Sequence, residues 1–349
     1  MPNPKYADLV LEGGGVKGVG LGGAYVAFRE AGYTAANVAG TSAGAITAAL
    51  IAANYPPEEL ERVIMELDYR QFEDKGWEDK LPLVEKTTSL LLDLGIYEGN
   101  RFLEWMGEML ASQGVKTFKD LIRDPDEENI RYRYRLSVIA SDVTNRQLLI
   151  LPEDAPKLGI KPDDLEVAYA VRMSMSIPIF FEPVRHVNPE TNEEHVIVDG
   201  GMLSNYPVWI FDAAQGEPPE WPTFGMLLVE PKHRDHLGKR IEPPKKERGV
   251  GALIDYLKSM AQTMMAAHDR LYVEQADFAR TIAIPTLGVG TTEFDVSEER
   301  RRKLFESGQK AVHDFLESWD FEAYVEEFRQ GREHKRRLSV LSEMGKAPV

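Results

Sequence analysis

The 349-residue chain contains no cysteine, so it has neither disulfide bonds nor thiolate metal sites. It also has no run approaching the roughly 20 apolar residues that a membrane-spanning helix needs. The first six residues lack the basic stretch followed by an apolar run that marks a secretory signal peptide. The missing cysteines do not establish a compartment, but from the other two absences we expect a cytoplasmic protein whose contact with membranes is at most peripheral.

The chain also has fewer basic than acidic residues. The 41 lysines and arginines are outnumbered by 57 aspartates and glutamates, which gives a formal net charge of −16. Such a protein repels nucleic acid and anionic membrane surfaces, so we predict no nucleic-acid partner. Any contact with anionic lipid must use a local patch, and the basic segment 232–248 is the best candidate. The composition of this segment is more typical of a flexible surface loop.

No internal repeat and no clear linker interrupt the chain, and hydrophobic residues make up 43% of it. This composition supports a sizeable core. We predict one domain over residues 1–330, followed by a basic, flexible tail at 331–349. The sequence carries no signal of an oligomeric state.

What the sequence does contain is a strand–helix–strand–helix pattern with two glycine-rich turns near its start. An apolar run at 7–11 is typical of a buried parallel strand, and it ends in the sequence GGGVKG at 13–18. A helical pattern follows. A second short strand, around 37–39, leads into GTSAG at 40–44, and an Ala- and Ile-rich helix comes next.

The second turn, Gly40-x-Ser42-x-Gly44, has the form of a nucleophile elbow, in which a serine sits on a sharp strand-to-helix turn. Flanking glycines suit this turn, because side chains there would collide with the neighbouring strand and helix. The following helix brings free N–H groups and its positive dipole end near the serine oxygen. The pattern favours a catalytic Ser42 over a tight turn that is merely capped by serine.

The first turn places three consecutive glycines after a strand, so their N–H groups can converge on an anion. That anion is either a phosphate or the oxyanion of an acyl-transfer intermediate. The spacing Gly13-x-Gly15-x-x-Gly18 also matches a dinucleotide fingerprint, which expects an acid about 20 residues later. No acid lies between residues 31 and 42, which disfavours a dinucleotide, and we expect no cofactor.

A serine nucleophile needs a base. None of the seven histidines follows a clear strand end in a glycine-rich loop. Asp199 does follow a short apolar strand, and Gly200 and Gly201 come directly after it. These glycines leave room for the carboxylate to approach another loop at the same sheet edge, where α/β proteins place their sites. Taken alone, the Asp-Gly-Gly sequence is more typical of an ordinary turn, so by itself it does not identify the base.

Together, the turns at 13–18, 40–44 and 199–201 resemble the motifs of the patatin-like phospholipase family in both their residues and their order. The stretch AVRMSMSIPIF at 170–180 is similar to the proline-containing segment that precedes the family's aspartate, and NYPV at 205–208 is similar to the Asn-x-Pro-Val that follows it. The similarity spans about residues 6–320. The sequence Arg-Met-Ser-Met within 170–180 departs from the smaller residues usual in the family, and this difference affects the expected shape of the pocket.

The resemblance implies a three-layer α/β/α patatin-like fold with a central, mainly parallel sheet. It also implies a metal-independent lipid acyl hydrolase acting on phospholipids, lysophospholipids or related esters. Ser42 would attack the ester carbonyl and Asp199 would accept the proton, without a histidine, while the amides of Gly13, Gly14 and Gly15 hold the oxyanion. Because the reference pKa of aspartate is about 3.9, we predict that burial raises the pKa of Asp199.

Several further residues are candidates for supporting the site: Lys17, Gly40, Gly44, Gly200, Gly201 and Asp142. Asp142 lies in a turn similar to a family loop near the site, and a purely structural role in that turn fits equally well. Two functions of other classes stay open. One is a non-catalytic protein that binds acyl lipids on the same fold, and the other is a dinucleotide-binding protein, against which the missing acid counts. Within the hydrolases, a Ser-His-Asp esterase is the alternative.

Elsewhere the patterns are weaker. Residues 72–97, inserted after the elbow helix, are a candidate lid over the serine or a helical layer packed on the sheet. Asn100 is a plausible cap for a helix to about residue 110. Residues 131–136 alternate arginine with tyrosine or leucine, which predicts a strand with one solvated face. Residues 282–285 suggest an edge strand, and Ser297 begins a C-terminal helix.

Overall fold

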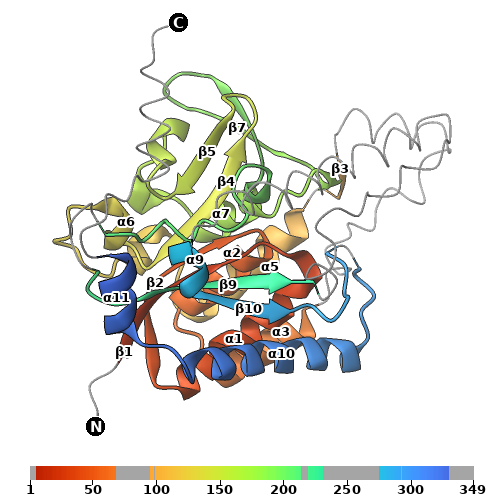
Figure 1. The fold of residues 1–349 in the computed structure, drawn as a ribbon. Coiled ribbons are helices and arrows are strands. Elements are labelled where there is room, and N and C mark those ends of the chain that lie inside the picture. Colours follow the sequence, from red (N-terminus) through yellow and green to blue (C-terminus); the bar gives the residue numbers. More distant parts are fainter. Residues whose placement is uncertain are drawn as a thin grey trace, which may run out of the picture.

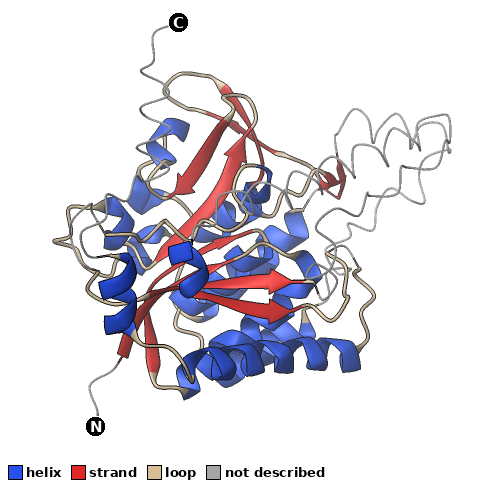
Figure 2. Ribbon diagram, viewed as in Figure 1, coloured by secondary structure: helices blue, strands red, loops and turns tan. Residues whose placement is uncertain are grey.

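A computed structural model describes residues 5–67, 95–97, 99–213, 219–230, 275–291 and 293–329. The fold is mixed α/β, with a central, mostly parallel sheet flanked by helices (Figures 1 and 2), which confirms the predicted fold class. The strands are β1 (Lys5–Leu11), β2 (Tyr33–Thr41), β3 (Gly95–Tyr97), β4 (Leu136–Asp142), β5 (Gln147–Leu151), β6 (Ile179–Phe181), β7 (Val184–Val187), β8 (Glu194–Asp199), β9 (Thr223–Val229) and β10 (Thr281–Pro285). The helices are α1 (Val19–Glu30), α2 (Ala43–Ala52), α3 (Pro57–Glu66), α5 (Asn100–Ser112), α6 (Ile130–Arg133), α7 (Val167–Ser174), α9 (Gln275–Ala279), α10 (Glu298–Leu316) and α11 (Phe321–Phe328).

Five neighbouring strands of the sheet are parallel, in the order β10-β9-β1-β2-β4. Beyond them, β5 and β8 pair antiparallel with β4, and β7 pairs antiparallel with β8. The carboxyl ends of the parallel strands meet at one edge, so the turns that follow β1 and β2 lie side by side there. The position of β10 at the end of the sheet agrees with the predicted edge strand.

The core is unequal on the two faces of the sheet, because side chains along a strand alternate between them. On β1, Leu9 and Leu11 join a large cluster that includes the buried faces of α1, α2 and α10. Val10, between them, joins a small cluster with Ile210 and Phe211 on the opposite face. Figure 1 shows α1, α3 and α10 running together along one side of the sheet.

Two local predictions were wrong. Arg131 and Arg133 belong to the helical turn α6, because the side chain of Asn129 caps that turn by accepting the N–H of Arg131 at 3.1 Å. A strand begins only at Leu136. Asn100 is the first residue of α5, and its cap is Gly99, whose φ of 76° suits glycine. Ser297, by contrast, caps α10 as predicted, accepting the N–H of Arg300 at 3.4 Å.

Other predictions lie outside the described residues. They concern the basic segment 232–248, the tail at 331–349 and all of the candidate lid 72–97 except its end. That end is β3, which pairs with β6. The extent of the domain stays a prediction. Within the described part of the chain, no helix combines the length and the apolar character needed to cross a bilayer.

Candidate active site

Ser42 joins β2 directly to α2 and has backbone angles of φ 54° and ψ −125°, a region that non-glycine residues rarely adopt. The turn is tight enough to require both flanking glycines. A β-carbon at Gly40 would lie 2.3 Å from the Gly44 carbonyl oxygen, and one at Gly44 would lie 2.4 Å from the carbonyl oxygen of Leu11. The structure therefore has a strained strand–serine–helix turn at the predicted place.

The Ser42 side chain is almost fully buried, with 1% of the residue exposed. Its Oγ lies 3.9 Å from Met175 Sδ, and its backbone N–H donates to Ser174 Oγ at 2.9 Å. The glycine turn is also close, since a β-carbon at Gly13 would lie 3.1 Å from the Ser42 β-carbon. Ser42 is therefore close both to the glycine turn and to the C-terminal end of α7.

Asp199, at the end of β8, is brought to Ser42 by strand register. Thr41 pairs with Ile139, and Asp199 pairs with Ala140, the next residue of β4. Because β5 occupies the opposite edge of β4 along residues 138–142, β2 and β8 share one edge and meet end to end there, which brings Ser42 next to Asp199. Gly200 is needed beside the acid, because a β-carbon there would lie 2.2 Å from the carbonyl oxygen of Ile139.

The Asp199 carboxyl group is fully buried. Its Oδ1 accepts the N–H of Gly201 at 2.7 Å, and its Oδ2 has no hydrogen-bond partner among the described residues. Burial raises the pKa of Asp199 to about 7, while the adjacent Ser42 hydroxyl and the Gly201 N–H act in the opposite direction. This agrees with the predicted direction, and it leaves the carboxyl group partly ionised at neutral pH.

The glycine turn is held by Asn205, which sequence reasoning noted only as part of a similar block. Its side-chain Nδ2 donates to the Gly13 carbonyl at 2.9 Å and to Glu12 Oε1 at 3.2 Å. Its own carbonyl accepts the Gly13 N–H at 3.1 Å. Of the predicted oxyanion donors, Gly13 is thus already hydrogen-bonded, whereas the Gly14 N–H has no partner among the described residues. Gly15 has a φ of 55° and packs against the Thr291 carbonyl.

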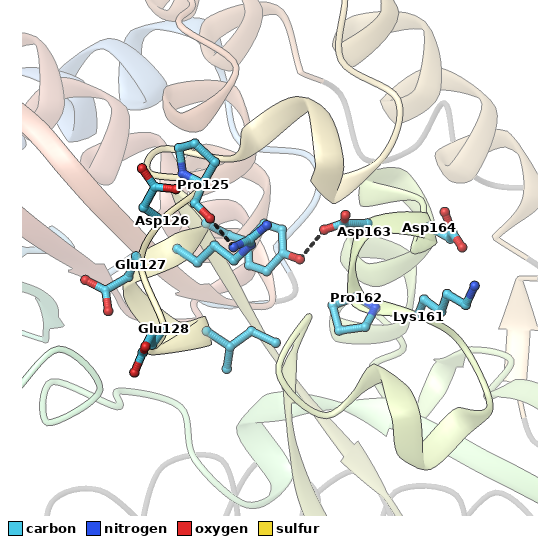
Figure 3. Close-up of a pocket in the computed structure, with 11 residues that line it drawn as sticks. Pro125, Asp126, Glu127, Glu128, Lys161, Pro162, Asp163 and Asp164 are labelled. Atoms are coloured by element: carbon cyan, nitrogen blue, oxygen red, sulfur yellow. Dashed lines mark hydrogen bonds between the residues drawn. The ribbon is translucent and has the colours of Figure 1, made fainter.

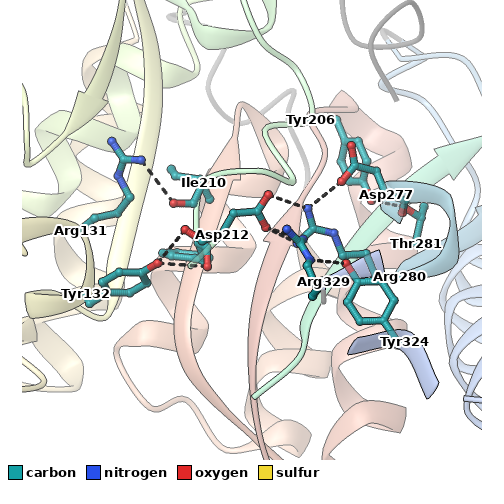
Figure 4. A network of polar contacts seen from close by, with 11 residues as sticks. Arg131, Tyr132, Tyr206, Ile210, Asp212, Asp277, Arg280, Thr281, Tyr324 and Arg329 are labelled. Atoms are coloured by element: carbon teal, nitrogen blue, oxygen red, sulfur yellow. Dashed lines mark hydrogen bonds and ion pairs between the residues drawn. The ribbon is translucent and has the colours of Figure 1, made fainter. Parts of the chain in front are cut away.

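The loop that carries Asn205 is itself anchored by a buried polar network (Figure 4). Next to Asn205, the hydroxyl of Tyr206 lies 2.8 Å from Thr281 Oγ1. Further along the loop, Asp212 binds the guanidinium of Arg280 with both oxygens and that of Arg329 with one. These bonds tie the loop to β10 and to the residue after α11. They give the network a supporting role in holding the glycine turn.

Two of the residues predicted to support the site, Lys17 and Asp142, form their polar contacts with residues other than Ser42. Lys17 forms an ion pair with Glu230, with Nζ 3.8 Å from Oε1. Asp142 accepts a hydrogen bond from His195 Nδ1 at 2.8 Å, and others from the turn that follows β4. Burial alone would raise the pKa of Asp142, but the bonds from His195, Asn145 and Gln147 hold it below its usual value. These contacts fit the structural role of Asp142. No described histidine hydrogen-bonds to Ser42.

A cavity of about 780 Å³ lies elsewhere, between the loop before α6 and the turn Pro162–Asp164 (Figure 3). Asp126 and Glu127 line one side, Asp163 and Asp164 line the other, and Tyr134 donates to Asp163. It shares no residue with the surroundings of Ser42. Among the described residues, no group of three or more histidines or acids is arranged to hold a metal ion.

Known proteins resemble this chain in sequence and in fold. The profile of the patatin-like phospholipase family matches residues 9–212. The protein YqhO of Bacillus subtilis (strain 168), itself uncharacterized, is 35% identical over 317 residues, which cover 90% of this chain and 100% of YqhO. The uncharacterized protein R571 of Acanthamoeba polyphaga mimivirus is 22% identical over 310 residues, covering 87% of this chain and 92% of R571.

Among solved structures, VipD from Legionella pneumophila matches with a TM-score of 0.52 and 19% identity, over 91% of this chain and 67% of VipD. At this identity the likeness shows the fold. The chain thus has the patatin fold, with a buried serine on a strained turn beside a buried aspartate. It belongs to the patatin-like phospholipase family, and this membership supports hydrolysis of lipid esters as its general activity.

Proposed function

We propose that this protein is a serine lipid acyl hydrolase that cleaves fatty-acyl esters through a Ser42–Asp199 dyad and an acyl-enzyme. The observation that carries the proposal is that β2 and β8 meet end to end along one edge of β4, which brings these two buried residues together. Phospholipids, lysophospholipids and related esters are the proposed substrates. Since such lipids reside in membranes, the proposal includes peripheral contact with a membrane surface.

In the first step, Ser42 Oγ attacks the ester carbonyl carbon while its proton passes to Asp199. A carboxylate with a pKa of about 7 accepts this proton far more readily than one with the ordinary value of 3.8. Asp199 Oδ2 is the oxygen without a hydrogen-bond partner among the described residues, so it is the proposed proton acceptor. The proton then moves from Asp199 to the leaving alcohol as the carbon–oxygen bond breaks.

The oxyanion of the tetrahedral intermediate needs N–H donors. The Gly14 N–H is the best supported of the three predicted glycines, because Gly13 already donates to Asn205. The Ala43 N–H is a second donor, since the first N–H groups of a helix have no intrahelical acceptor. The positive end of the α2 dipole acts on the same charge.

In the second step, Asp199 takes a proton from water, and the resulting hydroxide attacks the acyl carbon bound to Ser42. The bond from the acyl carbon to Oγ breaks, the proton returns to Oγ, and a fatty acid leaves. Each bond that breaks is matched by one that forms. The cycle therefore needs no reactant besides the ester and water.

The test is a panel of phospholipids, lysophospholipids and triglycerides, with the released fatty acids identified by mass spectrometry. The wild type should release fatty acid, and Ser42→Ala and Asp199→Asn should not. Ser137→Ala is the matched control, because Ser137 is also a buried serine but lies earlier on β4. Lipid binding without fatty-acid release in the wild type would refute the proposal and favour a non-catalytic lipid-binding protein.

A further inference from the structure

Three consecutive residues at the C-terminal end of α7, Ser174 to Ser176, contact the two members of the proposed dyad. The Ser174 hydroxyl oxygen accepts the Ser42 N–H at 2.9 Å, and Met175 Sδ lies 3.9 Å from Ser42 Oγ. The carbonyl of Ser176 accepts the N–H of Asp199 at 2.9 Å. Ser174 lies 132 residues after Ser42 in the sequence, so no local pattern connects them.

The Ser174 side chain is fully buried, and each of its hydrogen bonds has a fixed direction. A backbone N–H can only donate, so the hydroxyl oxygen accepts from Ser42. The hydroxyl proton is then free to donate to the Ile139 carbonyl, which lies 2.5 Å away. That carbonyl is also the group against which Gly200 packs, next to Asp199. Ser174 therefore links the main chain of Ser42 to the strand beside Asp199.

The hydrogen bond from the Ser42 N–H to Ser174 is made at a residue whose backbone is strained. Ser42 has a φ of 54°, and such a conformation persists only when its surroundings hold it in place. Loss of the Ser174 hydroxyl would leave the Ser42 N–H buried without its acceptor, and the turn would relax to find another. The Ser42 hydroxyl would then move relative to Asp199 and the glycine turn.

We propose that Ser174 is a positioning residue that holds the Ser42 turn in its reactive conformation through the hydrogen-bonded chain from Ser42 N–H to Ser174 to the Ile139 carbonyl. This role rests on the proposed function of Ser42. Ser174 does not contact the substrate. It acts on the rate by fixing where the nucleophile stands.

The test compares wild type, Ser174→Ala, Ser174→Thr and the control Ser137→Ala, first on a short p-nitrophenyl ester. A misplacement of about 1 Å costs roughly 100-fold in rate, so kcat of Ser174→Ala should fall by about 10- to 100-fold. KM should stay within about twofold. Ser174→Thr, which keeps the hydroxyl, should recover most of the lost rate, and Ser137→Ala should match the wild type.

A second measurement does not depend on activity. Hydrogen–deuterium exchange of peptides spanning residues 40–48 should become faster in Ser174→Ala, because the Ser42 N–H loses its acceptor. Exchange at the wild-type rate, or an unchanged kcat in folded Ser174→Ala, would overturn the positioning role. If the wild type shows no hydrolysis that depends on Ser42, the proposed function fails. In that case the exchange rates still test whether Ser174 holds the Ser42 N–H by a hydrogen bond.

Discussion

Replacing Asp199 by asparagine is expected to stabilise the folded protein at pH 8 while removing hydrolysis. Burial raises the pKa of this carboxyl group from 3.8 to about 7. Between these values the folded protein keeps a proton that the unfolded chain has released. The free energy of unfolding therefore falls as the pH rises through this interval. Asparagine is neutral at every pH and keeps an oxygen for the Gly201 N–H, so it avoids this cost.

The size of the gain follows from the same pKa. Each pH unit between 3.8 and about 7 contributes about 1.4 kcal/mol, which gives an upper value of about 4 kcal/mol at pH 8. Near pH 4 the gain shrinks to less than about 1 kcal/mol, because the carboxyl group is then largely protonated in both states. Urea denaturation at pH 4, 6 and 8 measures this difference directly.

Asp8 provides the matched control. It is also buried, and burial raises its pKa to about 7 too, but it lies on β1 and accepts the N–H of Asn37 at 3.1 Å. Asp8→Asn should show a similar pH-dependent gain in stability and keep full activity. A gain for Asp199→Asn that is the same at pH 4 and pH 8 would contradict the raised pKa. Hydrolysis retained by that variant would contradict the role of Asp199 as base.

Two further substitutions probe the surroundings of the serine. Met175→Ala should destabilise the protein by about 2–5 kcal/mol and raise the relative rate on bulkier acyl esters, because it removes a side chain that lies against the serine oxygen. Met173→Ala, also buried, should lose similar stability without changing the acyl preference. Asn205→Ala should lower kcat by about 10- to 100-fold, since the Gly13 carbonyl loses the hydrogen bond that holds the glycine turn. Asn188→Ala, at another buried asparagine, should leave kcat unchanged. Equal acyl preferences in both methionine variants, or equal kcat in both asparagine variants, would contradict these expectations.

The features that were predictable from sequence are those that local constraints fix. Gly40 and Gly44 are required by contacts within a few ångströms of the turn, so their spacing in the sequence reveals the turn itself. The apolar run before Asp199 likewise predicts a strand end. The pairing of Asp199 with Ser42 was reached only through resemblance to a family, because strand register between distant segments leaves no local pattern.

What sequence reasoning missed depends on contacts between distant parts of the chain. Asn205 holds the glycine turn although it lies 192 residues from Gly13 in the sequence. The only sequence feature that pointed to Asn205 was its membership in the NYPV block. The engagement of the Gly13 N–H by the Asn205 carbonyl had no signal at all. At Arg131 the alternating pattern was outweighed by a single side-chain cap from Asn129, which turned an expected strand into a helical turn.

The most direct test of the central claim is labelling with a fluorophosphonate, followed by peptide mapping and measurement of the labelling rate from pH 5 to pH 9. The adduct should lie on Ser42, and the rate should rise through about pH 7 as Asp199 ionises. Asp199→Asn should label roughly 100- to 10,000-fold more slowly, the usual contribution of a general base. An adduct on another residue, or labelling of Asp199→Asn at the wild-type rate, would contradict a Ser42–Asp199 dyad.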